Sequence, residues 1–201
     1  NMLLNNLNLE VSRFAARADN NNDAIKCVFF SRDKSVATDG FRLLEVSTSS
    51  AVKVEDMPPQ LNAMRGCDPF LVSAPCVSDL KKMKRGGGKK APIPALEYIA
   101  VSHVDDKQIE FTSTDLETTD HKQAKRIDAR FPDYQSIFPT GEPRATITIN
   151  AVLLAELLDT MSKIKSTHEV TIKIYADNKP VVLEAQGESQ KARALLMPIR
   201  G

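Results

Sequence analysis

Basic side chains gather in one short stretch of this sequence and in two smaller groups. The stretch has no acidic residue among its members, which are Lys81, Lys82, Lys84, Arg85, Lys89 and Lys90. The smaller groups are the pairs Arg13 with Arg17 and Lys163 with Lys165. Such side chains attract phosphate groups through a salt-dependent force that does not depend on base sequence. The alternative is structural, because basic residues complement the dipole at the end of a helix and charged runs are often solvated faces.

No arrangement of residues indicates catalysis. The histidines lie far apart in strand or loop settings, at His103, His121 and His168. The residue order suggests neither a Ser-His-Asp nor a Cys-His arrangement, and turns explain the neighbouring carboxylates at 105–106 and 115–117. The stretch 86–89 (GGGK) follows a predicted helix, whereas a phosphate-binding loop follows a strand and opens a helix. We therefore expect no enzyme, no cofactor and no metal site.

Composition narrows the class of protein. Hydrophobic residues make up 42% and charged residues 26% of the chain, which indicates a globular, core-forming protein. The net charge is only +1, so any nucleic-acid binding must come from a local patch. Cys27, Cys67 and Cys76 form no CxxC pair, so we expect neither a disulfide framework nor a zinc site, and a reducing cytoplasm fits best.

Targeting and membrane signals are not expected in this chain. The first residues are apolar only in fragments and lack a basic region, so they do not resemble a signal peptide. Met2 is the expected native start. No apolar run approaches the roughly 20 residues that span a bilayer.

The chain repeats one pattern, a strand, a helix and then several strands, three times. The third repeat is the clearest. Ala145–Ile149 alternates like a strand, and Asn150 is a suitable N-cap for a helix that runs through Lys165. A half-buried strand with Val170, Ile172 and Ile174 inward then follows. The last strands are expected at 181–185 and 192–199, after a turn at 177–180.

The second repeat has the same order of elements, and the first is the least regular. In the second, strand 70–72 precedes a helix at 75–85, and strands follow at 98–104, 108–114 and about 118–127. In the first, a helix at 9–18 precedes strands at 24–30, 35–38 and 42–47. Three helices, each set against a group of antiparallel strands, indicate an α+β architecture with segregated helices. An unrelated α+β fold with coincidental spacing is the alternative.

Three short stretches resemble signatures of the bacterial DNA polymerase III beta subunit, the sliding clamp, and they stand in the clamp's order. They are VATDGFRL at 36–43, RFPDYQSIFP at 130–139 and LLMPIR at 195–200. Phe41 stands where the family usually has His. The resemblance implies the DNA-clamp (processivity) fold, with helices on one face of antiparallel sheets. Residues 1–130 would form one full clamp-like domain of two repeat units, and residues 131–201 half of another.

The resemblance also implies a shallow apolar groove between two domains, where peptides of polymerases, the clamp loader and repair proteins dock. One wall would comprise Thr38, Gly40, Phe41, Arg42 and Leu43. Pro132, Ser136 and Ile137 would form the floor, and Met197, Pro198, Ile199 and Arg200 the other wall. Flexible Met, permissive Gly and hydrogen-bonding Arg suit such a groove. The structural alternative is that 38–40 is a common turn, Met197-Pro198 ends a strand and Leu43 is core.

Contact with duplex DNA is the second function that the resemblance implies, because clamp helices face the central hole of a ring. The basic residues named above would then meet the phosphates. The leading hypothesis is a noncatalytic processivity factor in DNA replication or repair, a homo-oligomer in the cytoplasm that binds duplex DNA and clamp-binding peptides. The alternative is a non-encircling peptide-binding module that competes with a host clamp. An enzyme of unrelated fold is a third class.

Overall fold

The computed structural model describes residues 2–31, 33–48, 57–62, 68–86, 93–164, 168–175 and 179–199. The chain divides into two compact units, unit 1 (Asn1–Ile137) and unit 2 (Phe138–Gly201). The architecture is α+β with antiparallel sheets, as the sequence predicts.

Unit 1 contains two four-stranded antiparallel sheets. The strands of the first follow the order β4-β3-β2-β5. Their bounds are β2 (Cys27–Ser31), β3 (Lys34–Thr38), β4 (Leu43–Ser47) and β5 (Phe70–Ser73). The strands of the second follow the order β1-β6-β7-β8. Their bounds are β1 (Met2–Leu4), β6 (Ile99–Asp105), β7 (Gln108–Thr114) and β8 (Thr119–Lys125).

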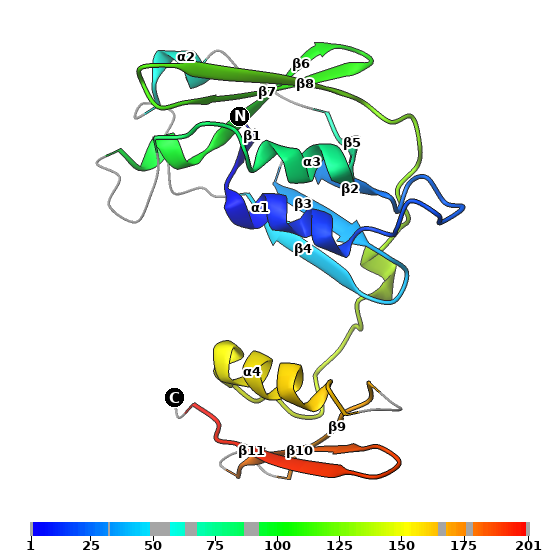
Figure 1. Cartoon of the computed structure of the whole chain (residues 1–201). Helices are drawn as coiled ribbons and strands as arrows, with labels where there is room; N and C mark the ends of the chain where they lie inside the picture. The colour runs from blue at the N-terminus through cyan, green and yellow to red at the C-terminus, as the bar shows by residue number, and fades with distance from the viewer. Residues whose placement is uncertain are drawn as a thin grey trace. The chain divides into compact units, whose positions relative to one another are not determined.

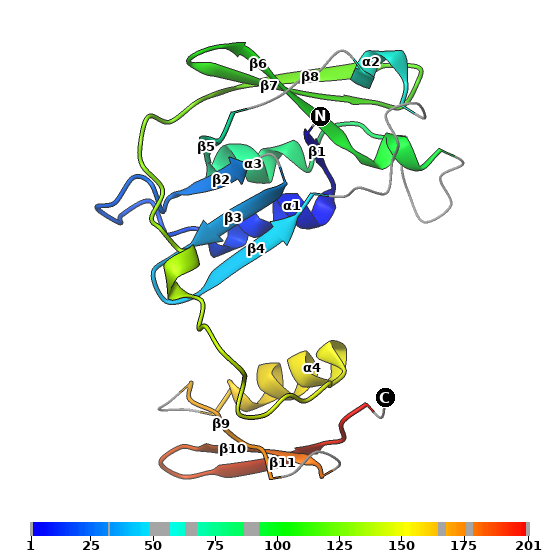
Figure 2. The same cartoon turned by 180° about the vertical axis from the view of Figure 1, so that it is seen from behind.

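Helices lie on one side of the first sheet. Helix α1 (Asn6–Glu10), which continues into the 3-10 turn η1 (Val11–Phe14), lies beside α3 (Ala74–Leu80) in front of β2, β3 and β4 in Figure 1. Figure 2 shows the opposite face of this sheet, with both helices behind it. The remaining helical segments are short: α2 (Pro59–Asn62), η3 (Pro94–Glu97) and η4 (Gln135–Ile137).

One apolar core joins the two sheets and the two helices of unit 1. Phe30 of β2 stacks on Phe70 of β5, with ring centroids 5.1 Å apart, and meets Phe111 of β7 edge-on at 6.5 Å. Leu9 from α1 and Leu80 from α3 are completely buried in the same cluster. The two repeats of unit 1 thus bury each other's apolar faces.

Both helices of unit 1 differ from their predicted bounds. The backbone N–H groups of Asn5 and Asn8 each donate to the other's side-chain oxygen at 3.1 Å, and this capping box starts the helix at Asn6, not at Leu9. The helical segment ends by Phe14 because Ala15 is extended (φ −73°, ψ 153°). The second helix ends at Leu80 instead of continuing to Arg85, and residues 81–82 form a turn.

Unit 1 extends beyond the predicted boundary at residue 130. Phe131 stacks on Phe29 with ring centroids 5.2 Å apart, and the Tyr134 hydroxyl donates to Glu45 Oε2 at 2.6 Å. Tyr134 itself is buried. These contacts attach the segment 131–137 to unit 1, because an aromatic ring and a hydroxyl both find partners there.

Unit 2 contains one helix and a three-stranded antiparallel sheet of order β11-β10-β9. The bounds are α4 (Ala151–Met161), β9 (Thr171–Lys173), β10 (Val181–Gln186) and β11 (Lys191–Leu196). The predicted N-cap is confirmed, because Asn150 Oδ1 accepts from the backbone N–H groups of Val152 and Leu153. The small core holds Met161, Val181, Leu183, Ala185 and Leu196.

Two predictions for unit 2 are wrong. Ala145–Ile149 takes part in no strand ladder among the described residues, although Ile147 and Ile149 pack against the core. The strand predicted with Ile172 and Ile174 inward shrinks to β9, and these side chains are 52% and 48% exposed. Both predictions fail for the same physical reason. Strand β9 is an edge strand, and nothing in the described part of unit 2 covers its outer side.

Candidate functional site

The first predicted wall is the loop that joins β3 to β4. Gly40 adopts φ +92°, a conformation that glycine reaches without strain. The Thr38 hydroxyl donates to the Arg42 carbonyl at 2.8 Å. Asp39 accepts from the backbone N–H groups of Phe41 and Arg42 and from the Arg42 side chain, all at 3.0 Å, and these bonds lower the pKa of Asp39. The loop is therefore a tight, self-bonded turn.

This turn presents one aromatic ring to solvent. Phe41 is 99% exposed. The Arg42 guanidinium instead lies 4.9 Å above the Phe14 ring, so Arg42 is held back against η1. Leu43 is only partly buried, so it is not a fully enclosed core residue. A tight turn can therefore also be one wall of a peptide-binding groove. The structural alternative, a common turn at 38–40, explains the shape of the loop but not the exposure of Phe41.

The predicted floor lies on η4 and the residues before it. Figures 1 and 2 both show η4 beside the β3–β4 loop, at the same end of the sheet. The Tyr134–Glu45 bond, together with an ion pair of 3.3 Å between Lys34 Nζ and Glu45 Oε2, fixes this segment to β3 and β4. Ile137 is 74% exposed, Ser136 is exposed and Pro132 is partly buried. The structure therefore brings the predicted floor and the first wall together within unit 1.

The other predicted wall lies in unit 2, after β11. Met197 and Ile199 are more than half exposed, and Pro198 between them is partly buried. The backbone N–H of Ile199 donates to the Thr148 carbonyl at 2.8 Å, which holds the segment in an extended course. Arg200 lies outside the described residues.

The predicted basic residues sit differently from expectation. Lys81, Lys82, Lys84 and Arg85 follow α3 and are not part of it, and Arg17 lies beyond η1, off the helix that carries Arg13. Lys163 lies in the turn after α4. Lys89, Lys90 and Lys165 lie outside the described residues.

Carboxylates from neighbouring elements pair with several of these cations. Lys81 Nζ lies 2.9 Å from Glu10 of α1, and Lys82 Nζ lies 2.7 Å from Asp79 of α3. The bond from Lys81 lowers the pKa of Glu10, and the bond from Lys82 lowers that of Asp79. Arg13 has a looser contact of 3.5 Å with Glu10.

Arg85 is the least available of the predicted DNA contacts. Its guanidinium donates to the carbonyl oxygens of Glu97 and Lys81, and burial lowers its pKa. Lys163 pairs with Asp159 at 2.8 Å in the turn after α4. Lys84, Arg17 and Arg13 are exposed. The exposed cations, rather than the whole predicted cluster, are thus the candidates for phosphate contact.

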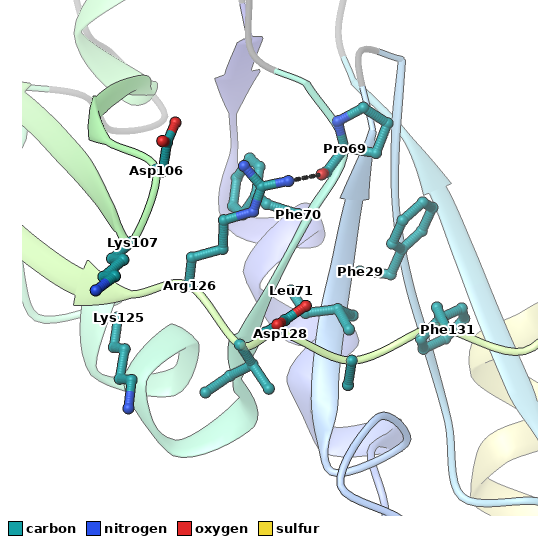
Figure 3. Close-up of a pocket in the computed structure, with 12 residues that line it drawn as sticks. Phe29, Pro69, Phe70, Leu71, Asp106, Lys107, Lys125, Arg126, Asp128 and Phe131 are labelled. Carbon is teal, nitrogen blue, oxygen red and sulfur yellow. Dashed lines mark hydrogen bonds between the residues drawn. The ribbon is translucent and has the colours of Figure 1, made fainter.

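A cleft of about 780 Å³ in unit 1 was not predicted from the sequence (Figure 3). Phe29 and Phe131 line one end, and Lys107 and Lys125 lie at the other. Arg126 donates to the carbonyl of Pro69, the residue before β5, at 3.0 Å. Acidic and basic residues both line the cleft, and no one class of ligand is favoured. These side chains come from distant parts of the sequence and lie together only in the folded chain.

The described residues contain no group of His, Cys, Asp and Glu side chains that could hold a metal ion. Within the same part of the chain, no helix is long and apolar enough to cross a membrane. Cys27 and Cys76 are free thiols, and burial raises the pKa of each.

The antiparallel sheets of this chain, with helices on one side, form the DNA-clamp fold. The chain is similar to solved bacterial DNA polymerase III beta sliding clamps. It matches the Streptococcus pyogenes beta subunit with TM-score 0.68 and 14% identity, over 100% of this chain and 50% of that one. The Streptococcus pneumoniae beta chain gives TM-score 0.67 and 16% identity, over 99% and 49%. A Pseudomonas aeruginosa clamp bound to griselimycin gives TM-score 0.62 and 14% identity, over 100% and 51%.

The chain therefore has the sliding-clamp fold and spans about half the length of the clamps that it matches. No protein-family model matches the sequence, and no curated protein matches it.

Proposed function

We propose that this chain is a noncatalytic, sliding-clamp-like accessory protein of DNA replication or repair, which contacts duplex DNA and docks clamp-binding peptides. The observation that carries the proposal is the likeness of the fold to bacterial sliding clamps along essentially the whole chain. Three sequence stretches that resemble clamp signatures support it. A cytoplasmic location is part of the proposal.

Exposed apolar side chains support peptide docking. Phe41, Ile137, Met197 and Ile199 all stand largely in solvent, and each belongs to one of the three clamp-like stretches. Large apolar side chains that remain exposed on a folded chain often mark a binding surface. Flexible methionine suits a surface that accepts several different peptides.

Peptide binding is tested with a fluorescent peptide that carries the clamp-binding segment of a bacterial DNA polymerase III. Combining Leu43→Ala with Met197→Ala should weaken binding at least tenfold, which corresponds to about 1.4 kcal/mol. The matched control combines Leu7→Ala with Val104→Ala, which removes exposed apolar side chains elsewhere on the chain. Equal affinity of the test and control variants would contradict the groove.

Exposed cations beside α1 and α3 support contact with DNA. Arg13, Lys82 and Lys84 extend into solvent from neighbouring parts of unit 1. The ion pairs of Arg13 and Lys82 are solvent-exposed. Such pairs are worth only about 0–1 kcal/mol, so DNA phosphates can compete for these cations. Contacts of this kind hold the duplex without reading bases, as a sliding protein requires.

DNA contact is tested by reversing three charges, Arg13→Glu, Lys82→Glu and Lys84→Glu. We expect affinity for a duplex to fall and the slope of log K against log salt to flatten by about 0.9 per lost phosphate contact. The control reverses Lys125, Lys179 and Lys191, which are exposed and equal in charge. A control variant that loses as much affinity would show that bulk charge alone matters.

The second candidate function is a peptide-binding module that never encircles DNA. The pairing of partly buried Lys81 with Glu10 favours it, because this carboxylate reduces the positive charge available to phosphate. Retention on closed circular DNA, lost when the circle is cut, would exclude this alternative. Peptide binding without such retention would favour it.

A further inference from the structure

The two repeats of unit 1 exchange strands. The strand that precedes α1, β1, does not join the sheet of its own repeat but pairs antiparallel with β6 of the second repeat. The strand that precedes α3, β5, pairs antiparallel with β2 of the first repeat. In each case the leading strand covers the first strand that follows the other repeat's helix. The exchange therefore completes both sheets at once.

Unit 2 has the same elements without the exchange. Its leading segment, Ala145–Ile149, precedes α4 but joins no ladder within the described residues, and β9, the first strand after α4, is the open edge of its sheet. The Thr148 carbonyl accepts from the Ile199 N–H, just as the Leu71 carbonyl of β5 accepts from the Ile127 N–H. The leading segment is thus placed as β5 is, but no strand in the described part of unit 2 pairs with its other side.

Burial shows the same difference position by position. Val28 and Phe30, the second and fourth residues from the start of β2, are completely buried. Ile172 and Ile174 occupy the corresponding positions from the start of β9 and are 52% and 48% exposed. An apolar sheet edge of this kind is a site for adding another strand.

The helices agree with the strands. Val77 and Leu80 stand four and seven residues after the N-cap of α3, and both are completely buried. Leu154 and Leu157 stand at the same distances from the N-cap Asn150 in α4 and are only partly buried. A repeat that cannot bury its own apolar face needs a second repeat against it.

We propose that a second copy of this chain completes unit 2. The leading segment of each copy pairs antiparallel with β9 of the other, and the two α4 helices pack together as α1 and α3 do. A second copy fits because it carries both missing pieces, a strand to cover β9 and an uncovered strand to receive the leading segment. The contact is isologous, with the same surface of each copy used once.

The faces of the strands, together with the pairing of β5 with β2, set the register. Residues directly opposite each other in an antiparallel pair lie on one face of the sheet. Ile147 and Ile149 face the core, so they meet residues on the same face of the sheet as buried Leu183. In unit 1, Val72 lies opposite Val28 and Phe70 opposite Phe30, and the same alignment selects Ile172 and Ile174. Ile149 then lies opposite Ile172, Thr148 opposite Lys173, and Ile147 opposite Ile174.

This pairing rests on the fold alone and is independent of the proposed DNA and peptide functions. The dimer holds two copies of unit 1 and one composite domain made from two copies of unit 2. It therefore contains three whole domains. A negative result in the DNA-binding or peptide-binding assay would therefore not count against the dimer.

A cysteine cross-link tests the register in the full chain. The variant that combines Thr148→Cys with Lys173→Cys is prepared with ¹⁴N and ¹⁵N, mixed under denaturing and reducing conditions, refolded and oxidised. The proposal predicts that about half of the linked 148–173 peptides carry both isotopes. Linked peptides with one isotope only, or no linked peptide, would overturn it. The control combines Thr148→Cys with Lys191→Cys, because Lys191 lies on β11, away from β9, and should not cross-link.

Neighbouring residues on opposite faces of β9 give a second test that does not depend on a disulfide. Ile172→Asn should raise the dimer dissociation constant at least tenfold, because the side chain enters the interface. Thr171→Asn, on the other face of the strand, should change it less than threefold. Sedimentation measures both, and circular dichroism checks that the sheets remain folded. Equal dissociation constants for the two variants would overturn the proposal.

Discussion

Unit 1 and unit 2 are built from the same repeat, and they differ in how well that repeat is covered. In unit 1, two repeats exchange strands and share one core that includes Phe30, Phe70 and Phe111. In unit 2, one repeat stands with the apolar edge of β9 and part of α4 in solvent. The comparison shows that the repeat is a half-structure, whose sheet is complete only when another repeat supplies a strand.

Truncation of one leucine in each unit gives the largest contrast. Leu80→Ala in the shared core should lower the free energy of unfolding of unit 1 by about 2–5 kcal/mol, the usual cost of a buried leucine. Leu157→Ala, at the matching position of α4, should cost clearly less at low protein concentration because Leu157 is only partly buried there. Hydrogen exchange of amides in each unit measures both. Equal costs under dilute conditions would contradict the comparison.

A buried polar residue distinguishes the two units next. The Asn8 side chain donates to Ser35 Oγ at 3.0 Å and to the carbonyl oxygens of Val46 and Ser47, and it is completely buried. Asn8→Ala would leave these acceptors without that donor, so a loss of about 2–3 kcal/mol is expected from urea unfolding. Leu153 holds the matching position in unit 2 and is exposed, so Leu153→Ala should cost little. A cost for Leu153→Ala as large as that for Asn8→Ala would break the parallel.

Protein concentration should separate the units without any substitution. If a second copy completes unit 2, each tenfold rise in concentration should stabilise that unit by about 1.4 kcal/mol per mole of dimer, because binding shifts the folding equilibrium by mass action. Unit 1 should not respond. Unit-specific hydrogen exchange at several concentrations checks this, and a response of unit 1 alone would reverse the assignment.

The smallest expected effect comes from acid. Lys173 Nζ, at 2.6 Å, and Arg193 Nε, at 3.2 Å, both contact Glu184, which joins the three strands of unit 2; chiefly the bond from Lys173 lowers the pKa of Glu184. A carboxyl with a depressed folded-state pKa stabilises the fold above its unfolded pKa and loses that contribution as the pH falls through the folded value. Wild type should therefore be slightly more stable than Glu184→Gln at neutral pH. The difference should vanish in acid, and a constant difference across the titration would exclude the ion pairs as its cause.

The sequence predicts features that depend on neighbouring residues. Asn150 is the N-cap of α4, and the strand at 108–114 has the predicted bounds, because a cap and an alternating pattern are local signals. The reciprocal Asn5–Asn8 cap was missed, since an asparagine-rich start resembles a loop. Strand β1 was missed for a related reason: its apolar run is short, and its stability comes from pairing with β6 far along the chain.

The candidate site shows the same division. The sequence predicts the turn that carries Phe41 and the group of cations after α3. It does not predict which carboxylates pair with those cations. Glu10 reaches Lys81 only because α1 and α3 pack together. The cleft beside Arg126 likewise depends on a bond to Pro69 from a distant part of the chain. Long-range contacts of this kind leave no mark in local residue patterns.

Light scattering of the intact chain across a range of concentrations is the most direct test of the central claim, that a second copy completes unit 2. The account predicts a mass of at least twice the chain mass of 22.2 kDa, with an even number of chains in each particle. It also predicts that Ile172→Asn shifts this mass toward the monomer while Thr171→Asn does not. A mass of 22.2 kDa at every concentration would contradict the account, because unit 2 would then be stable with its β9 edge uncovered.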